Sequence, residues 1–116
     1  MKVIIAGVRT FDDYDLLCRR CDNILSSQNE IEIVTGAAKG ADKLGERYAK
    51  EKGYPIKLFP ADWDKYGSSA GPIRNKQMAE YADALIAFWD GKSKGTKNMI
   101  ELANKYALKI RIIIIE

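Results

Sequence analysis

The stretch Ile33-Val34-Thr35-Gly36-Ala37-Ala38-Lys39-Gly40-Ala41-Asp42 decides the fold. An apolar run passes into glycines and small residues and then into a helical pattern, which predicts a strand, a tight loop and the first turn of a helix. Such a junction leaves backbone N–H groups unpaired, and the helix dipole favours an anion such as phosphate beside them. The alternative is an ordinary strand-to-helix turn whose glycines provide positive φ angles.

Length and composition restrict the class of protein. The chain has 116 residues, of which 47% are hydrophobic and 30% charged, and this predicts a single domain spanning residues 1–116. No apolar run approaches the roughly 20 residues needed to cross a bilayer, and no signal pattern follows Met1. We therefore expect a cytoplasmic protein with no membrane partner. The net charge of +3 suits a small anionic ligand and gives weak support to nucleic-acid binding.

Two cysteines form a Cys-x-x-Cys pair at Cys18 and Cys21. Together with Leu17, Ile24 and Leu25 they fall at helical spacing on one apolar face, which favours structural thiols. A redox pair would instead open a helix at the end of a strand. Because the chain contains no histidine, we expect no metal site, and mechanisms that need an imidazole base are excluded.

Strand and helix patterns alternate along the whole chain. The predicted strands are Lys2–Ala6, Ile31–Thr35, Pro55–Phe59, Ala84–Trp89 and Lys109–Ile115. The predicted helices run from Asp12 to Ser27, from Gly40 to Gly53, from Pro72 to Tyr81, and from the loop that ends at Thr96 to Ala107. Residues 61–71 are expected to form a long functional loop. The isoleucines of the last strand predict burial on both of its faces.

This alternation predicts an α/β fold. We expect a Rossmann-like three-layer sandwich with a mainly parallel five-stranded sheet in the order 3-2-1-4-5 and helices on both faces. In that order the chain reverses between the first and fourth strands, and ligands bind there at the carboxyl ends. The loops at that edge are 7–10, 35–42 and 90–96. Their glycines favour a shared phosphate-binding cleft over plain turns.

Four segments together resemble the SLOG superfamily, namely residues 34–42, 71–78, 82–91 and 93–100. That superfamily groups the LOG phosphoribohydrolases with the DNA-processing protein A domain. The chain is most similar to the small stand-alone YspA/YpsA-related branch, and the similarity extends to residues 4–12. The resemblance implies a nucleotide-binding domain of Rossmann type.

The resemblance also indicates which functional residues are present. LOG enzymes cleave the N-glycosidic bond of nucleoside monophosphates with an Arg in one motif and a Glu in another. Arg74 and Met78 match the Arg-bearing motif, and Asn75 occupies its Lys position. Gly95 and Thr96 match the second motif. The resemblance therefore implies that the phosphate-binding part is retained.

The second motif lacks its acid, because Met99 stands at the position of the Glu. A thioether neither accepts a proton nor stabilises an oxocarbenium ion. Glu101 lies on a different face of the predicted helix. The catalytic residues are therefore unassigned, and the remaining candidates are Arg74 and Asp90.

Each candidate side chain has two interpretations. Asp42 either binds a ribose hydroxyl or caps its helix, with capping favoured, and Asp90 either contacts a sugar or metal or caps a turn. Trp63 either stacks on a nucleobase or fixes its loop to the body. The predicted ligand-binding residues are Gly7, Arg9, Thr10, Thr35, Gly36, Ala37, Lys39, Gly40, Asp42, Trp63, Arg74, Asn75, Asp90, Gly91, Ser93, Lys94, Gly95 and Thr96. Arginines are favoured over the lysines as phosphate clamps.

Three functions follow from these observations. The favoured one is binding, without catalysis, of a mononucleotide, a dinucleotide or an ADP-ribose-like ligand, with no cofactor required. The second is a hydrolase that cleaves an N-glycosidic or phosphate bond of a nucleotide. The third is single-stranded DNA binding, which the modest charge disfavours. The resemblance also implies a homodimer formed near the Arg-bearing helix, with Met78 or Tyr81 in that contact or in the core.

Overall fold

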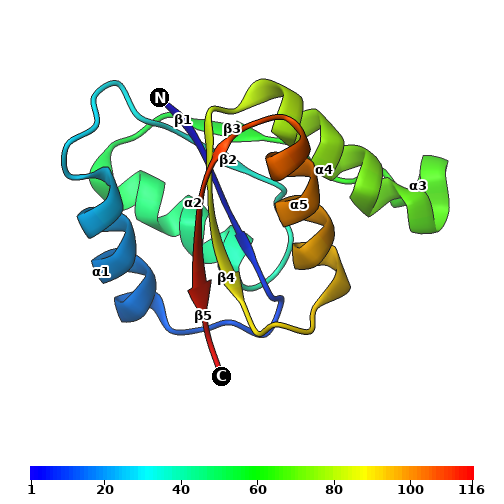
Figure 1. The fold of residues 1–116 in the computed structure, drawn as a ribbon, viewed down its shortest axis with the longest axis horizontal. Helices are drawn as coiled ribbons and strands as arrows, with labels where there is room; N and C mark the ends of the chain where they lie inside the picture. Colours follow the sequence, from blue (N-terminus) through cyan, green and yellow to red (C-terminus); the bar gives the residue numbers. More distant parts are fainter.

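The computed structural model describes residues 1–116 and contains one five-stranded sheet in the order β3-β2-β1-β4-β5 (Figure 1). All four strand pairings are parallel. The strands are β1 (Lys2–Gly7), β2 (Glu32–Thr35), β3 (Ile56–Leu58), β4 (Ala84–Trp89) and β5 (Lys109–Ile114). The predicted fold class and strand order are confirmed.

Five α-helices connect the strands. They are α1 (Tyr14–Leu25), α2 (Ala41–Lys52), α3 (Trp63–Tyr66), α4 (Ala70–Tyr81) and α5 (Lys94–Lys105). The prediction of one long loop over residues 61–71 is wrong, because this segment contains α3, a 3-10 turn at Gly67–Ser69 and the start of α4. The Asp62 side chain caps α3 by accepting a hydrogen bond from the Lys65 amide at 3.1 Å. Such a short helix leaves no periodic pattern in the sequence.

The helices cover the two faces of the sheet in pairs, as Figure 1 shows. Val3 and Ile5 of β1 point into a core with α1 and α2, whereas Ile4 and Ala6 point into a second core with residues of α4 and α5. All four side chains are buried because β1 is the central strand. Cys21 is buried in the first core and Cys18 packs at its border, so the helical face predicted for the thiols is confirmed.

Strand β5 lies at an edge of the sheet and has only β4 as a neighbour. The prediction that it is buried on both faces is wrong, because Ile112 is 41% exposed and Ile114 is 65% exposed. Only Ile113 is buried within the strand. A run of isoleucines is typical of an interior strand, but here the strand order places it where neighbouring backbone is present on one side alone.

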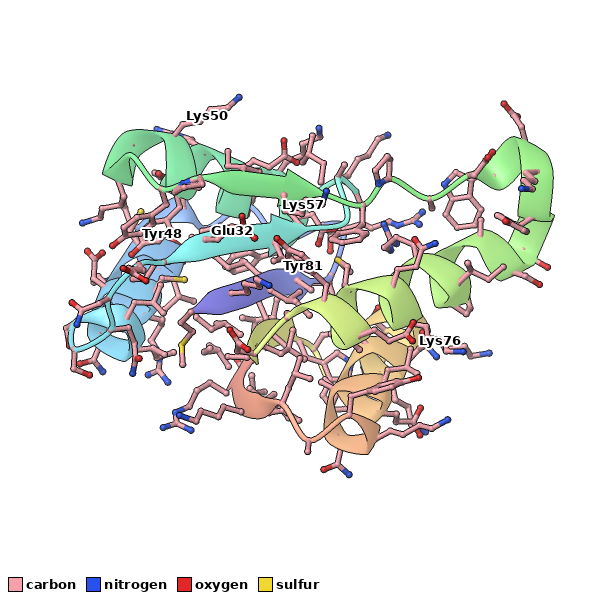
Figure 2. The ribbon with its side chains drawn as sticks, turned by 90° about the horizontal axis from the view of Figure 1, so that it is seen from above. Glu32, Tyr48, Lys50, Lys57, Lys76 and Tyr81 are labelled. Carbon is pink, nitrogen blue, oxygen red and sulfur yellow. The ribbon has the colours of Figure 1, made fainter.

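Polar contacts connect neighbouring elements at the amino ends of the strands. This end of the sheet lies opposite the predicted ligand-binding edge. The Tyr81 hydroxyl, at the end of α4, donates a hydrogen bond to Glu32 at the start of β2. Figure 2 labels both side chains. The ammonium of Lys2 lies 4.3 Å from the centroid of the Tyr81 ring. Met78, one turn earlier, is 1% exposed and belongs to the core. No helix of the chain combines the length and apolarity needed to span a membrane.

Candidate functional site

A cavity of about 530 Å³ opens at the carboxyl ends of β1 and β4, where the strand order reverses. Residues 6–10, the β4–α5 loop and the first turns of α4 and α5 line it. Its apolar part is formed by Ala6, Val8, Met78 and Met99. A second cavity of about 410 Å³ lies beside it against the β2–α2 loop. Cavities are therefore present at the carboxyl edge of the sheet, where the sequence predicted the ligand-binding cleft.

Most predicted ligand-binding residues line one of these cavities. The first cavity is lined by Gly7, Arg9, Thr10, Asp42, Trp63, Arg74, Asn75, Asp90, Ser93, Lys94, Gly95 and Thr96. The second adds Gly36, Ala37 and Lys39 to the shared Arg9, Trp63 and Arg74. Thr35, Gly40 and Gly91 line neither cavity.

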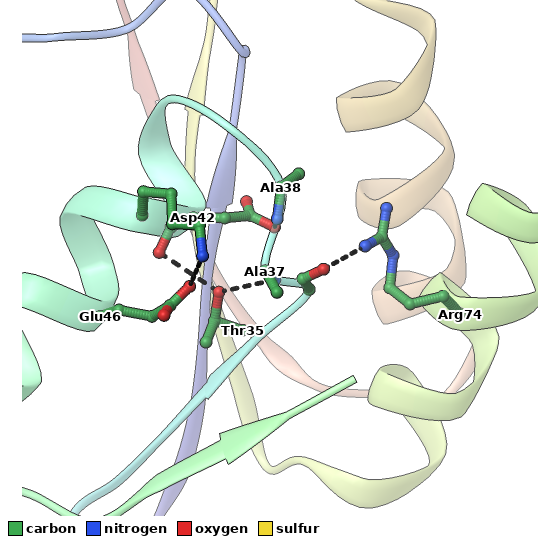
Figure 3. A network of polar contacts seen from close by, with 8 residues as sticks. Thr35, Ala37, Ala38, Asp42, Glu46 and Arg74 are labelled. Carbon is green, nitrogen blue, oxygen red and sulfur yellow. Dashed lines mark hydrogen bonds and ion pairs between the residues drawn. The ribbon is translucent and has the colours of Figure 1, made fainter. Parts of the chain in front are cut away.

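Hydrogen bonds from Thr35 and Asp42 fix the conformation of the β2–α2 loop, residues 36–40 (Figure 3). The Thr35 hydroxyl donates to the carbonyl oxygen of Asp42 at 3.2 Å and accepts from the Ala37 amide at 3.2 Å. The Asp42 carboxylate accepts from the Ala38 amide at 3.3 Å. The expectation that this loop offers unpaired amides is therefore wrong at Ala37 and Ala38. A side-chain carboxylate of the chain itself occupies the position expected for an anion.

Gly40 has a structural role at the end of the same loop. Its φ is +75°, and a Cβ at this position would lie 2.3 Å from the carbonyl oxygen of Val8. That carbonyl accepts a hydrogen bond from the Ala41 amide at 3.3 Å. The absence of a side chain thus allows the β2–α2 loop to cross the β1–α1 loop in direct contact. Gly40 positions two walls of the site without reaching the cavity.

Asp42 is the most perturbed acid of the site. It lies in the first turn of α2 and is 5% exposed. Burial raises its pKa to about 6, and the Ala38 amide and the Arg74 guanidinium oppose this rise. Asp42 therefore braces the loop, although Gly40 rather than Asp42 is the N-cap residue.

Arg74 is the central cation of the site. It lies on α4, is 8% exposed, and donates from Nη1 to the carbonyl oxygen of Gly36 at 2.6 Å. Its Nε donates to Oδ1 of Asn75 at 2.9 Å. Burial lowers its pKa, Asp42 raises it, and the charge of Arg9 lowers it again. Nη2 makes no hydrogen bond within the chain, and Arg74 lines both cavities.

The N-terminus of α5 faces the first cavity. Asp90 Oδ1 accepts from the amides of Lys92 and Ser93, each at 2.8 Å, which fixes the preceding turn and lowers the pKa of Asp90. This is the turn-capping role, and the exposed Gly91 completes the turn with a φ of +78°. Helix α5 has no side-chain cap, so the amides of Lys94, Gly95 and Thr96 are unpaired within the chain. They present the positive end of a twelve-residue helix to the cavity.

Asn98 belongs to the site, although the sequence did not single it out. Asn75 donates from Nδ2 to Oδ1 of Asn98 at 2.9 Å and to the carbonyl oxygen of Gly95 at 3.3 Å. These bonds connect α4 with the start of α5 and hold Arg74 through Asn75. A single asparagine inside a helix gives no sequence signal. In the Arg-bearing motif Asn75 occupies the position of a Lys. In the structure Asn75 positions the Arg74 side chain.

Trp63 is 49% exposed at the entrance of both cavities. The Arg9 guanidinium carbon lies 5.8 Å from the centroid of its ring, which is within the range of a cation–π contact. Both side chains are exposed, and no hydrogen bond from either is present. The chain assembles no group of three or more acidic or thiol side chains able to hold a metal.

The chain belongs to the YspA, cpYpsA-related SLOG family, whose family model matches residues 1–66. The Gene 61 protein of Mycobacterium phage D29 is 32% identical over 119 residues, and the alignment covers 94% of this chain and 93% of the phage protein. The resemblance to this superfamily drawn from the motifs is therefore confirmed.

A solved structure supports the fold independently. The DNA processing protein A (DprA) from Streptococcus pneumoniae is similar to 99% of this chain with a TM-score of 0.75 at 18% sequence identity. The chain spans half the length of that protein. At this identity the similarity shows the Rossmann-like fold alone.

Proposed function

We propose that this protein binds a nucleotide or nucleotide-derived ligand at the carboxyl edge of its sheet. The observation that carries the proposal is the free Nη2 of the buried Arg74 in a cavity that also receives the uncapped N-terminus of α5. A buried guanidinium donor and three unpaired amides form a site for an anion, and phosphate is an anion that both helix N-termini and arginines bind.

The remainder of the cavity suits a nucleoside. Met78 and Met99 provide polarisable apolar surface, and Trp63 provides an aromatic face at the entrance. A volume of about 530 Å³ lies within the usual range for small-molecule sites. The phosphate would lie at the α5 end and the base along the apolar wall.

Binding without catalysis is favoured by the side chains at the reaction position. Met99 is 1% exposed and lines the cavity where the related enzymes carry a Glu. Asp90, the remaining acid candidate, is engaged in its own turn and has a lowered pKa. Oδ1 of Asp90 accepts from both amides of its own turn, which gives this carboxylate a structural role.

Isothermal titration calorimetry with AMP, GMP, CMP and UMP tests the proposal. We expect a dissociation constant below about 1 mM for at least one of them, and a loss of about tenfold or more in Arg74→Gln. The matched control is Arg111→Gln, which removes an exposed arginine outside both cavities. Absence of binding to every nucleotide would reject the proposal.

The same samples separate the two other functions expected from the sequence. Chromatography after long incubation reveals hydrolysis as free base or free phosphate, and that result would replace binding with catalysis. Titration with a single-stranded oligonucleotide at two salt concentrations reveals nucleic-acid binding as an affinity that falls steeply with salt.

A further inference from the structure

Asp42 and Arg74 approach each other across the backbone of Gly36, and Figure 3 shows them on opposite sides of the β2–α2 loop. A Cβ on Gly36 would lie 2.4 Å from Nη1 of Arg74 and 2.9 Å from Oδ2 of Asp42, so the gap between the two charged groups is too small for a methyl group. They nevertheless form no ion pair with each other, since the ion pairs of the chain involve other residues. Each is bonded to the loop instead, Arg74 to the Gly36 carbonyl and Asp42 to the Ala38 amide.

The carboxylate of Asp42 belongs to the wall on which an anion would lie. Asp42 and Arg74 are both buried and both line the first cavity, which also receives the N-terminus of α5. An anion held there by Arg74 introduces a second negative charge close to Asp42, and like charges repel strongly where burial lowers the effective dielectric constant. The anion also neutralises Arg74, whose charge favours the ionised form of Asp42. Both effects disfavour the ionised carboxylate.

Other charged groups around Asp42 act in the same setting. Glu46, one turn later on α2, raises the pKa of Asp42, and it pairs with the ammonium of Lys43 at 3.5 Å. The other charged side chains that line the first cavity are Arg9, Asp90 and Lys94. Because burial already raises the pKa of Asp42 to about 6, a further rise on anion binding brings its titration into the neutral range.

We propose that Asp42 takes up one proton from solvent when an anion binds at Arg74, so that binding is coupled to pH. This proposal rests on the proposed function and concerns the regulation of that site. The proton neutralises the carboxylate, and one of its oxygens remains able to accept from the Ala38 amide. Affinity therefore rises as the pH falls from about 8 to about 6, and it levels off below about pH 5, where Asp42 is already protonated without ligand.

Calorimetry of AMP binding to the wild type and to Asp42→Asn tests the proposal. Titrations in two buffers of different ionisation enthalpy give the number of protons taken up, and protons bound by the phosphate of AMP appear equally in both proteins. At about pH 7 we expect the wild type to take up about half a proton more than Asp42→Asn. From about pH 8 to about pH 5.5, its affinity should increase about fivefold or more relative to that of the variant.

The proposal also predicts that Asp42→Asn binds AMP more tightly than the wild type at about pH 8, because the amide is neutral at every pH. A residue that only supports the loop would instead weaken binding when it is replaced. Glu46→Gln is the matched control, since it removes a neighbouring acid of α2 that lines neither cavity. This variant keeps the Asp42 carboxylate and should retain the proton uptake.

Circular dichroism checks that each variant is folded. If Asp42→Asn is unfolded, the methyl ester of AMP gives the proton count on the wild type alone, because this phosphodiester does not titrate near neutral pH. Equal proton uptake by the wild type and Asp42→Asn, or weaker binding by the variant at both pH values, would overturn the proposal and leave nucleotide binding intact. Absence of AMP binding to the wild type at either pH would instead reject the proposed function.

Discussion

Nη1 of Arg74 donates to the carbonyl oxygen of Gly36 at 2.6 Å and so connects α4 with the β2–α2 loop. Arg74 belongs to α4, and Gly36 belongs to the loop that follows β2. A Cβ on Gly36 would lie 2.4 Å from the same Nη1, so a side chain here would displace the guanidinium. The cation of the site is thus positioned by backbone that belongs to a different strand–helix unit.

Removing this cation should affect stability as well as binding. Arg74→Leu loses two hydrogen bonds made by a charged group and leaves the carboxylate of Asp42 without a nearby cation. We expect a fall of about 2–4 kcal/mol in the free energy of unfolding, measured by urea denaturation. Arg111→Gln should change it by less than about 0.5 kcal/mol. Equal effects would contradict the structural role of Arg74.

Two glycines with nearly the same φ should respond differently to alanine. Gly40 has a φ of +75° and its Cβ would meet Val8, whereas Gly53 has a φ of +76° and nothing within 4 Å. We expect Gly53→Ala to cost about 1 kcal/mol and Gly40→Ala more than about 3 kcal/mol, because Gly40 combines the clash with a ψ of −127°, whereas Gly53 has the left-handed helical ψ of 24°. Thermal unfolding measures both, and similar melting temperatures would show that the two loops do not cross in contact.

Two substitutions of Gly95 in α5 distinguish an effect on stability from an effect on anion binding. Gly95 is exposed in its first turn, and nothing lies within 4 Å of a Cβ there. Gly95→Ala should stabilise the fold by about 0.5–1 kcal/mol through helix propensity and leave the charge unchanged. Gly95→Asp should also stabilise it through the helix dipole but weaken AMP binding severalfold by repulsion. Unchanged AMP affinity in Gly95→Asp would place the phosphate elsewhere.

The raised pKa of Asp42 predicts how the free energy of unfolding depends on pH. Its pKa of about 6 lies above the value of 3.8 for a free side chain, so the folded protein binds this proton more tightly than the unfolded chain. The resulting stabilisation is complete below about pH 4 and is lost as the pH rises through 6. Relative to Asp42→Asn, the wild type should gain up to about 3 kcal/mol between pH 7 and pH 4.

Melting temperatures of both proteins across that range measure the effect. The Asn oxygen can still accept from the Ala38 amide, so the variant retains the loop contact. Arg74 and Glu46 also act on Asp42, in opposite directions. A difference between the two proteins that does not vary with pH would mean that Asp42 titrates as an exposed acid.

The two thiols should react at different rates. Burial raises the pKa of Cys21 to about 12, and Cys21 is fully buried, whereas Cys18 is partly exposed. Because the thiolate is the reactive form, iodoacetamide at pH 8 should modify Cys21 only after unfolding in urea. Mass spectrometry of Cys18→Ser before and after unfolding checks this. Rapid labelling of that variant in its native state would contradict the burial.

The sequence predicted the arrangement of strands better than the roles of loop residues. Alternating patterns and short connections are local, and the chirality of crossovers then leaves few strand orders. The roles of Thr35 and Gly40 depend on Asp42 and Val8, which no pattern connects to them. Both were expected to contact ligand, and both support the walls instead.

Within the site, Arg74 was predicted from its motif, but its burial and its bond to Gly36 were not. A motif identifies a residue type at a position, whereas its free donors depend on which partners the fold supplies. Asn98 was missed for the same reason, since its partner Asn75 lies on another helix. The exposure of Ile114 follows from edge placement, which the isoleucine run alone does not reveal.

The position of β1 between β2 and β4 has a kinetic consequence. Lys2 donates its amide hydrogen to Asp83, a partner 81 residues away in the chain, and the β1–β4 register follows from there. Contacts over such separations form slowly because closing a long loop costs entropy before any pairing compensates for it. The cavity lies at the seam between these strands. We therefore expect the binding edge to be completed late in folding, after β1, β2 and β3 have paired.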